Sequence, residues 1–189
     1  MYWGNNMLKL VHAFEMNFDS VKDYYNSFED KWFDLNCYAI SCVENGFKAY
    51  FDEVSMYDPN LYYLIDDEKP NYIIGYGSIE NSKVLDYHLS YLNQGNIGYG
   101  IRLSERNKGY GTKLLRLLLL KCEELGMTEV CVSCLKKNIA SSKVILNNKG
   151  KLEKEFWHDD SAEYGLKYWI KLRPKIIVKA RKIIKRLKY

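Results

Sequence analysis

The sequence predicts a mixed α/β domain, also describable as α+β, in which helices cover both faces of a β-sheet in a three-layer sandwich. Three observations lead to this prediction. The chain has 189 residues, which suits one compact domain with its own core. Its 47% hydrophobic and 28% charged residues are close to the averages of globular proteins that fold without a partner. Segments with strand alternation and segments with helical spacing follow one another along the chain.

The N-terminal half is predicted to contain a strand, two helices and a hairpin. Residues 7–14 (MLKLVHAF) alternate as a strand does. Asp19 is a good N-cap for the first helix, and a second helix is expected near 43–55, where apolar residues recur at helical spacing. Two strands, 60–66 (NLYYLID) and 71–79 (NYIIGYGSI), flank the charged turn DEKP and form the hairpin.

The C-terminal half alternates between strands and helices. A polar loop is expected over 81–96, then a glycine-containing strand over 97–103 (IGYGIRL). A helix begins between Gly109 and Thr112, and its many leucines predict that it is buried on most sides. The remaining elements are a strand over 128–134 (TEVCVSC), a short helix over 141–148 (SSKVILNN) and a hairpin of strands 151–157 (KLEKEFW) and 164–172 (YGLKYWIKL).

Residues 173–189 differ in charge from the rest of the chain. They hold eight Lys or Arg and no acidic residue, so residues 1–172 carry −4 within a total of +4. Apolar residues recur there at three- and four-residue steps, as in a basic amphipathic helix. We therefore divide the chain into a domain (1–172) and a basic C-terminal tail (173–189). Packing on its own domain or on a second subunit of a homodimer, attachment to an anionic membrane face, and, with least support, nucleic-acid binding all explain such a tail.

The cysteines and histidines bear on compartment and metal binding. The five cysteines are odd in number and follow no secretory signal, which favours free thiols in the cytoplasm. Cys131 and Cys134 form a CVSC that has no second cysteine pair, and His12, His88 and His158 are scattered, so we expect no metal site. No run of 18 apolar residues occurs, so no membrane-spanning helix is predicted, and any membrane contact would be peripheral.

The most informative stretch is RLSERNKGYGT (102–112), where the leucine-rich helix begins. The first N–H groups of a helix lack intrahelical acceptors, and the peptide dipoles give that end partial positive charge. Gly109 and Gly111 allow an anion to approach the backbone, and Arg106 and Lys108 add positive charge. The stretch lacks the GxxxxGK[ST] of a Walker loop and the third glycine of GxGxxG, which leaves Arg-x-x-Gly-x-Gly.

Over residues 97–150 the sequence resembles the GCN5-related N-acetyltransferase (GNAT) family. The segment SERNKGYGT is most similar to a bacterial subgroup of predicted acetyltransferases. RNKGYG resembles the family's [Q/R]-x-x-G-x-[G/A] pyrophosphate loop. IGYGIRLSE resembles its fourth strand, TEVCVSC its fifth strand, and KNIASSKVILNNKG the following helix with its N-x-G turn. The order of elements over 7–172 agrees. The resemblance implies a mixed, mostly antiparallel central sheet flanked by helices, and an enzyme that moves an acetyl group from acetyl-CoA to an amine of a small molecule or peptide, without a metal.

The resemblance also implies which residues bind the cofactor. Backbone groups of Ile101 and Leu103, at the splayed end of the fourth strand, would pair with the pantetheine arm. Asn138 would contact that arm from the other side. The pyrophosphate would lie against the loop residues, which are Arg106, Asn107, Lys108, Gly109, Tyr110, Gly111 and Thr112.

The catalytic residues that the family usually carries are absent from their usual positions. Many members protonate the leaving thiolate with a tyrosine seven residues after the asparagine, and that position is Ile145 here. The carboxylate that some members place early in the fourth strand falls near Gly95 or Asn96. Neither glycine nor asparagine acts as a base, so the proton-transfer groups must lie elsewhere.

Two side chains are candidates for that role. Tyr99 shares strand parity with Ile101 and would face the cleft where the thioester lies. His88 is the second candidate, because a neutral imidazole accepts a proton near pH 7. A water relay would replace both. The alternative function is a catalytically weak acyl-CoA-binding module whose basic tail docks on a membrane or a protein partner.

Overall fold

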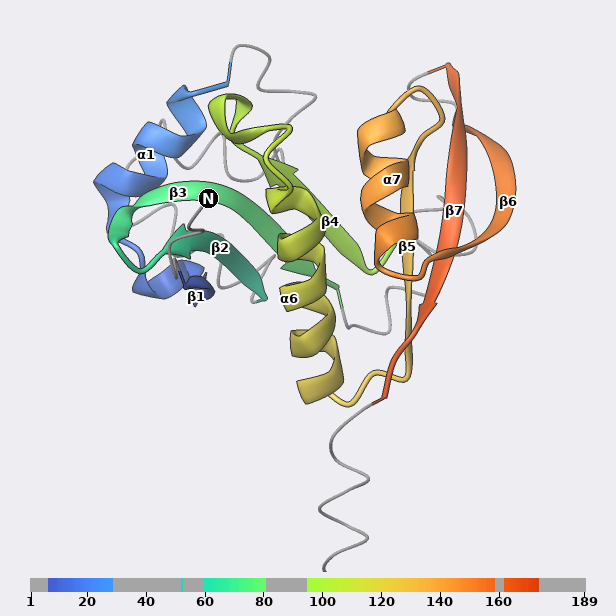
Figure 1. The fold of residues 1–189 in the computed structure, drawn as a ribbon, viewed down its shortest axis with the longest axis horizontal. Coiled ribbons are helices and arrows are strands. Elements are labelled where there is room, and N and C mark those ends of the chain that lie inside the picture. Colours follow the sequence, from blue (N-terminus) through green and yellow to red (C-terminus); the bar gives the residue numbers. More distant parts are fainter. Residues whose placement is uncertain (1–6, 29–51, 53–59, 81–94, 159–161, 174–189) are drawn as a thin grey trace, which may run out of the picture. The chain divides into compact units, whose positions relative to one another are not determined.

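The computed structural model describes residues 7–28, 52, 60–80, 95–158 and 162–173 (Figure 1). The chain forms two compact units. The first unit comprises residues 1–80 and 98–115, and the second comprises 81–97 and 116–189. The leucine-rich helix α6 (Tyr110–Glu124) therefore begins in the first unit and ends in the second.

The first unit is built on a four-stranded sheet in the order β1-β2-β3-β4. Its first three strands pair antiparallel, with the predicted hairpin in the middle. The turn of that hairpin is tighter than expected, because pairing continues to Asp66 and Lys69 and leaves only Asp67 and Glu68 outside the ladder. The strands are β1 (Leu8–His12), β2 (Leu61–Asp66), β3 (Lys69–Ile79) and β4 (Ile97–Ile101).

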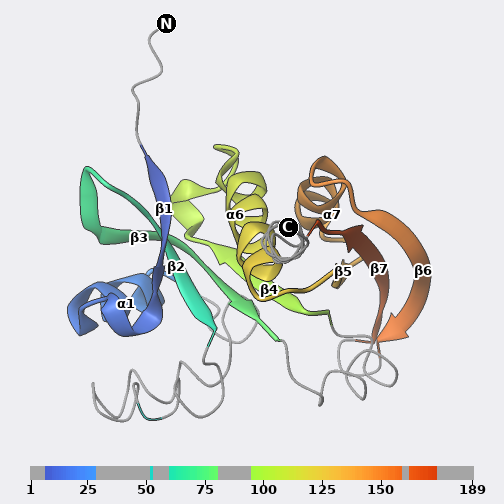
Figure 2. The same cartoon turned by 90° about the horizontal axis from the view of Figure 1, so that it is seen from below.

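Helix α1 (Phe18–Asn26) lies against β2 and β3 (Figure 2). The contact is largely aromatic: the ring of Tyr24 lies 6.1 Å from that of Tyr63 and 6.4 Å from that of Tyr76, both in edge-to-face orientation. Tyr24 and Tyr63 are fully buried. Buried aromatic pairs of this kind contribute about 0.5–1.5 kcal/mol beyond their buried area, so the many tyrosines of this chain help to build the core of the first unit.

The start of α6 lies on the opposite face of the same sheet. Because Tyr76 points toward α1, the neighbouring Gly75 points the other way. A Cβ atom at Gly75 would lie 2.7 Å from Cδ1 of Ile101 and 3.3 Å from Cδ2 of Leu114 in α6. Helices therefore cover both faces of this sheet, as the sequence predicts.

Two boundaries differ from the sequence prediction. The first strand ends at His12, because its Nδ1 accepts a hydrogen bond from the Phe14 amide and caps a short 3-10 helix, Ala13–Glu15. The N-cap of α1 is Asn17, whose Oδ1 accepts from the Ser20 amide at 2.8 Å, so the prediction of Asp19 was wrong. Asn17 has the extended backbone that an N-cap requires, whereas Asp19 already lies inside the first turn.

The second unit contains a three-stranded antiparallel sheet in the order β5-β7-β6. Helix α7 (Ile139–Asn147) packs on it, and the hydroxyl groups of Ser142 in α7 and Tyr168 in β7 lie 2.8 Å apart. The predicted strand, helix and final hairpin are confirmed. The strands are β5 (Glu129–Leu135), β6 (Lys151–His158) and β7 (Glu163–Lys171).

The expected mixed α/β architecture of antiparallel strands flanked by helices is confirmed, with the strands divided between two sheets where a single sheet was expected. The expectation for α6 was too strong. Leu114, Leu115 and Leu118 are fully buried, but Leu120 is 40% exposed and Leu125, just beyond the helix end, is 41% exposed. The helix is thus amphipathic, with one buried face.

Several predictions fall outside the described residues. They are the helix near 43–55, the loop over 81–94 with His88, and residues 174–189 of the basic tail. Of the helix near 43–55 only residue 52 is described, and it is helical.

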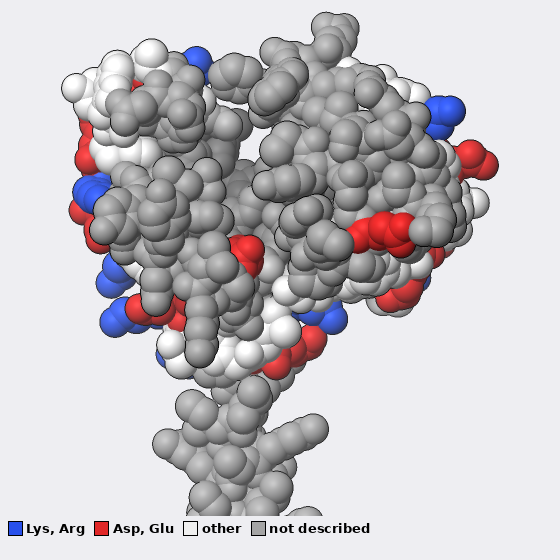
Figure 3. All heavy atoms as spheres, turned by 180° about the vertical axis from the view of Figure 1, so that it is seen from behind, with Lys and Arg blue, Asp and Glu red and all other residues white. Residues whose placement is uncertain are grey.

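The described charged side chains on the face drawn in Figure 3 are of both signs and form no continuous basic patch. Within the described segments no helix is long and apolar enough to cross a membrane.

Candidate functional site

The loop between β4 and α6 begins with a turn rather than with more strand. β4 ends at Ile101, and Leu103–Glu105 form a 3-10 helix. The Arg102 amide still donates to the carbonyl of Ile74 at 2.9 Å, which extends the pairing with β3 by one residue. Leu103 therefore lies beyond the strand, and of the two residues expected to offer strand-like backbone groups only Ile101 is in β4.

The N-terminus of α6 presents a row of amides that have no acceptor in the described part of the chain. Gly109 is the N-cap, because its carbonyl accepts the first helical hydrogen bond, from the Lys113 amide. Asn107 and Gly109 both have positive φ, of 62° and 81°, which turns successive N–H groups toward one side. Among the described residues, none accepts a hydrogen bond from the amides of residues 107–111. These amides and the helix dipole fit an anion such as a pyrophosphate.

Gly109 is the residue that this geometry requires. Residues other than glycine, asparagine and aspartate rarely adopt a backbone φ near 81°, the value at Gly109. A Cβ atom at Gly109 would find nothing within 4 Å, so the space before the amides is open. The loop therefore combines a left-handed backbone with free access to its N–H groups.

The charged side chains of the loop are partly engaged. Nε of Arg106 donates to the carbonyl of Ile101 at 3.2 Å, which holds the guanidinium beside the end of β4. Nζ of Lys108 lies 3.0 Å from Oε2 of Glu105. Lys108 was expected to add a full positive charge to the anion site, but its charge is partly offset by Glu105.

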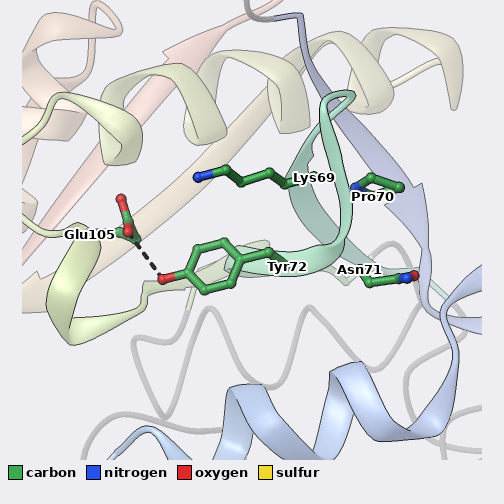
Figure 4. Close-up of a pocket in the computed structure, with 5 residues that line it drawn as sticks. All are labelled: Lys69, Pro70, Asn71, Tyr72 and Glu105. Carbon is green, nitrogen blue, oxygen red and sulfur yellow. Dashed lines mark hydrogen bonds between the residues drawn. The ribbon is translucent and has the colours of Figure 1, made fainter.

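Glu105 is itself fixed by a second partner. The Tyr72 hydroxyl of β3 donates to Oε1 of Glu105 at 3.0 Å (Figure 4). Both residues line a pocket of about 610 Å³ at the tip of the β2–β3 hairpin, together with Lys69, Pro70 and Asn71. The pocket borders the loop at Glu105.

Arg102 is a residue of the loop region that sequence reasoning missed. Its side chain is 7% exposed. Nε donates to the carbonyl of Ile73 at 2.8 Å, and Nη2 donates to Oδ2 of Asp23 at 2.8 Å. The sequence offers one signal, a charged residue between the apolar residues Ile101 and Leu103 at a strand end, where alternation would place it on a buried or half-buried face.

Tyr99 and Ile101 share one face of β4, as expected for an uninterrupted strand. Ile101 reaches over Gly75 toward Leu114, so this face is the one on which α6 begins. Tyr99 is half-buried. The structure thus places Tyr99 in the same unit as the loop and on the α6 side of its sheet. His88 lies outside the described residues.

Asn138 lies in the second unit, where it caps α7. Its Oδ1 accepts from the Ser141 amide at 3.0 Å. The side chain is exposed, and its Nδ2 has no hydrogen-bond partner among the described residues. The cap therefore fixes the amide group of Asn138 and leaves its two N–H donors available.

The positions of the missing catalytic residues serve structural roles. Ile145 is fully buried. The backbone N–H of Asn96 donates to the carbonyl of Cys131 at 2.7 Å, and its Oδ1 accepts from the Cys131 amide at 2.7 Å. A Cβ at Gly95 would lie 2.5 Å from the Cys131 oxygen, so glycine is required by the close approach. Both residues are used to bind β5.

The three cysteines of the described residues are not activated as nucleophiles. Burial raises the pKa of Cys122 to about 12 and that of Cys131 to about 11, so both are thiols at neutral pH. Burial also raises the pKa of Cys134, against a hydrogen bond with Ser141. Tyr24 is fully buried, and its burial raises the pKa of its hydroxyl well above the usual value. In the described segments no group of three His, Cys, Asp or Glu side chains is arranged to hold a metal ion.

This loop lies in a domain of known family. The model of the acetyltransferase (GNAT) domain matches residues 29–151. The chain therefore belongs to the GNAT acetyltransferase family, and it is an acetyl-CoA-dependent N-acetyltransferase, as the resemblance of residues 97–150 implied. No curated protein matches this chain.

Solved structures support the fold. RimL, the ribosomal L7/L12 alpha-N-protein acetyltransferase, was solved with coenzyme A; it aligns with a TM-score of 0.64 at 15% identity over 89% of this chain and 96% of that chain. The ribosomal-protein-S5-alanine acetyltransferase from Vibrio fischeri aligns with a TM-score of 0.63 at 13% identity, over 90% and 95%. The yncA protein from Salmonella typhimurium, solved with its cofactor acetyl-CoA, aligns with a TM-score of 0.58 at 12% identity, over 89% and 95%. At these identities the likeness is one of fold.

Proposed function

We propose that the loop from Arg106 to Thr112 binds the pyrophosphate of acetyl-CoA, and that the protein transfers the acetyl group to an amine of a small molecule or a peptide. The observation that carries this proposal is the row of amides at residues 107–111, at the start of a 15-residue helix, for which the described part of the chain provides no acceptor. Positive φ at Asn107 and Gly109 aims these amides, and the open space before Gly109 admits a phosphate.

Other residues would hold the rest of the cofactor. The backbone of Ile101, the last residue of β4, would pair with the pantetheine arm, with Leu103 beyond it in the 3-10 turn. For Asn138 the family resemblance implies a role as a donor, and Nδ2 is the atom that would donate, since Oδ1 is already engaged by the α7 cap.

Bound acetyl-CoA supplies the thioester, and the protein must supply proton transfer. The acceptor amine has to be neutral to attack, and the leaving thiolate has to be protonated. Ile145 cannot do this, because it is an apolar side chain in the core. Tyr99 is the described candidate, since it lies on the α6 side of β4 and carries a hydroxyl; His88 and a water relay are the alternatives.

The solved relatives suggest which acceptors to test. Two of them are acetyltransferases of ribosomal proteins, one acting at the alpha-amine of L7/L12 and one at the alanine of S5. A third is described as a phosphinothricin N-acetyltransferase, whose acceptor is a small molecule. The test is to incubate the purified protein with acetyl-CoA and either peptides with a free N-terminal amine or small amines, and to follow release of the CoA thiol.

The expected result is amine-dependent thiol release, with acetylated acceptor confirmed by mass spectrometry. The matched control is the same peptide with a blocked N-terminus, which should give only background release. No acetylation of any amine, together with no binding of CoA by calorimetry, would overturn the proposal.

A further inference from the structure

A buried arginine stands where β4 passes into the loop. Arg102 is the first residue after β4, and its side chain is 7% exposed. A charge buried to this degree is costly unless each donor finds a partner. Nε and Nη2 do so, on the Ile73 carbonyl and the Asp23 carboxylate, both at 2.8 Å.

The rings of two tyrosines complete the surroundings of the guanidinium. Its central carbon lies 4.5 Å from the ring centroid of Tyr72 and 5.3 Å from that of Tyr24. Arg102 thus joins α1, through Asp23 and Tyr24, to β3, through Tyr72 and Ile73. We call Asp23, Tyr72, Arg102 and Glu105 the Arg102 clasp.

Stability alone does not explain an arginine at this position. Replacing a buried ion pair with apolar residues of similar volume is often neutral or stabilising. Unlike an apolar side chain, the guanidinium carries N–H donors in a fixed planar arrangement, so it sets the orientation of the groups that it binds as well as packing against them. Asp23 is 63% exposed, so its pairing with Arg102 adds orientation more than stability.

The clasp continues into the loop. Tyr72, which stacks on Arg102, donates its hydroxyl to Oε1 of Glu105 at 3.0 Å, as Figure 4 shows. Oε2 of Glu105 binds Lys108 at 3.0 Å. The Glu105 amide also donates to the Arg102 carbonyl at 2.9 Å. Side chains and backbone therefore hold the 3-10 turn from both of its ends.

The segment that follows this turn has a conformation that it would not keep by itself. Asn107 and Gly109 are both left-handed. Such backbone conformations persist where surrounding contacts over-determine them. From β3, the Tyr72 hydroxyl reaches Glu105 and lies 3.3 Å from Oγ of Ser104, and Arg102 binds the Ile73 carbonyl, so the clasp holds the turn from which the amides at 107–111 follow.

We infer that Arg102 is a positioning residue for cofactor binding: through Tyr72 and Glu105 it pre-orders the loop amides that receive the pyrophosphate. This inference rests on the proposed function of the loop. A pre-ordered loop loses less conformational freedom when it binds, which appears as higher affinity. Loss of the clasp should weaken cofactor binding without removing any group that touches the cofactor.

The test compares four variants and one control with the unchanged protein. Asp23→Asn removes the charge that pairs with the Arg102 guanidinium. Arg102→Met keeps an unbranched, flexible stem and removes the charge and the donors. Arg102→Lys keeps the charge and removes the fork. Tyr72→Phe keeps the ring over Arg102 and removes only the hydroxyl that binds Glu105. Tyr25→Phe is the control, because it too removes one hydroxyl contact of a tyrosine in the first unit, in this case a buried one with Tyr63 at 3.2 Å that does not involve the loop.

Binding of CoA by calorimetry and the kinetics of acetyl transfer are measured for each variant. Arg102→Met should raise Kd for CoA and KM for acetyl-CoA at least tenfold, with kcat at saturation within about threefold. Arg102→Lys should fall between Arg102→Met and the unchanged protein, and Tyr72→Phe should raise Kd about threefold. Tyr25→Phe should lower the melting temperature and leave Kd unchanged, which separates positioning from general stability.

The outcomes distinguish this inference from the proposed function. If the unchanged protein does not bind CoA, the proposed function of the loop fails. If it binds CoA and a folded Arg102→Met binds equally well, the positioning role is overturned. Should Arg102→Met not fold, Tyr72→Phe and Asp23→Asn decide, since both change partly exposed residues; unchanged affinity in both overturns the inference.

Discussion

The sharpest test of the anion-binding loop is a pair of substitutions at Gly109. Gly109→Asn and Gly109→Asp introduce side chains of nearly the same shape, which differ by one negative charge. Both residues tolerate a left-handed backbone better than others and both are good N-caps. Since a Cβ at Gly109 meets nothing within 4 Å, neither side chain meets a steric obstacle at its base. The pair therefore isolates charge at the entrance to the amides.

The expected magnitude follows from the charge that the cofactor brings. A carboxylate about 6 Å from a phosphate interacts with each negative charge at roughly 0.7 kcal/mol in water and about 2.8 kcal/mol at a surface dielectric near 20. For the two charges of a pyrophosphate this is roughly 1.5 to 5 kcal/mol, or at least a tenfold higher Kd for Gly109→Asp than for Gly109→Asn. The free variants should both lose about 1 kcal/mol of stability, because φ at residue 109 is 81°.

The assay is thermal unfolding with and without CoA, followed by calorimetric titration. At a hundredfold excess over Kd, binding stabilises the native state by about 2.7 kcal/mol, which for a chain of this size corresponds to about 5–10 °C in Tm. Gly109→Asn should keep most of this shift and Gly109→Asp should lose at least about half of it, and added salt should narrow the difference in Kd between the two variants. Equal Kd values for the two variants at low salt would refute the placement of the pyrophosphate at this loop.

Three further predictions concern catalysis, the tail and the buried thiols. Tyr99→Phe should leave CoA affinity unchanged and lower kcat about 100-fold if the hydroxyl protonates the leaving thiolate; kcat equal to that of the unchanged protein would exclude Tyr99. If the tail attaches to an anionic membrane face, truncation after Arg173, whose amide still donates to Glu123 at 3.2 Å, should keep the fold and CoA binding and abolish sedimentation with anionic vesicles; unfolding of the truncated chain would favour a packed tail. Burial raises the pKa of Cys122 from 9.0 to about 12 and that of Cys131 from 9.0 to about 11. The folded protein therefore keeps both thiols protonated at a pH where the unfolded chain loses the protons, so stability is highest below pH 9 and falls as pH rises from 9 toward 11 and 12. The two thiols should lower the free energy of unfolding by about 2.5 kcal/mol between pH 8 and 10. Urea titrations of Cys122→Ala should show about half of this decrease; a decrease as large as that of the unchanged protein would contradict the raised pKa of Cys122.

The sequence determined the elements that depend on neighbouring residues. Alternation fixed the hairpin of β2 and β3 and that of β6 and β7, and helical spacing fixed α1, α6 and α7. The Arg-x-x-Gly-x-Gly loop was also readable, because a left-handed glycine and the first amides of a helix are properties of a few consecutive residues. These local properties were enough to indicate the family.

Tertiary structure decided the partners of the charged and polar side chains. Arg102 binds Ile73, 29 residues away, and Asp23, 79 residues away, and no local pattern reports such pairings. In the same way Asn96 and Gly95 serve the contact with Cys131, 35 residues beyond Asn96.

Even within the loop, Glu105 has a partner from another strand, because the Tyr72 hydroxyl of β3 donates to the carboxylate that also pairs with Lys108. Local backbone conformation is set by short-range sterics and hydrogen bonds, so it can be predicted from a few consecutive residues. The state of a buried charge is set by whichever groups the folded chain brings within hydrogen-bond distance, and it exists only once the chain has folded.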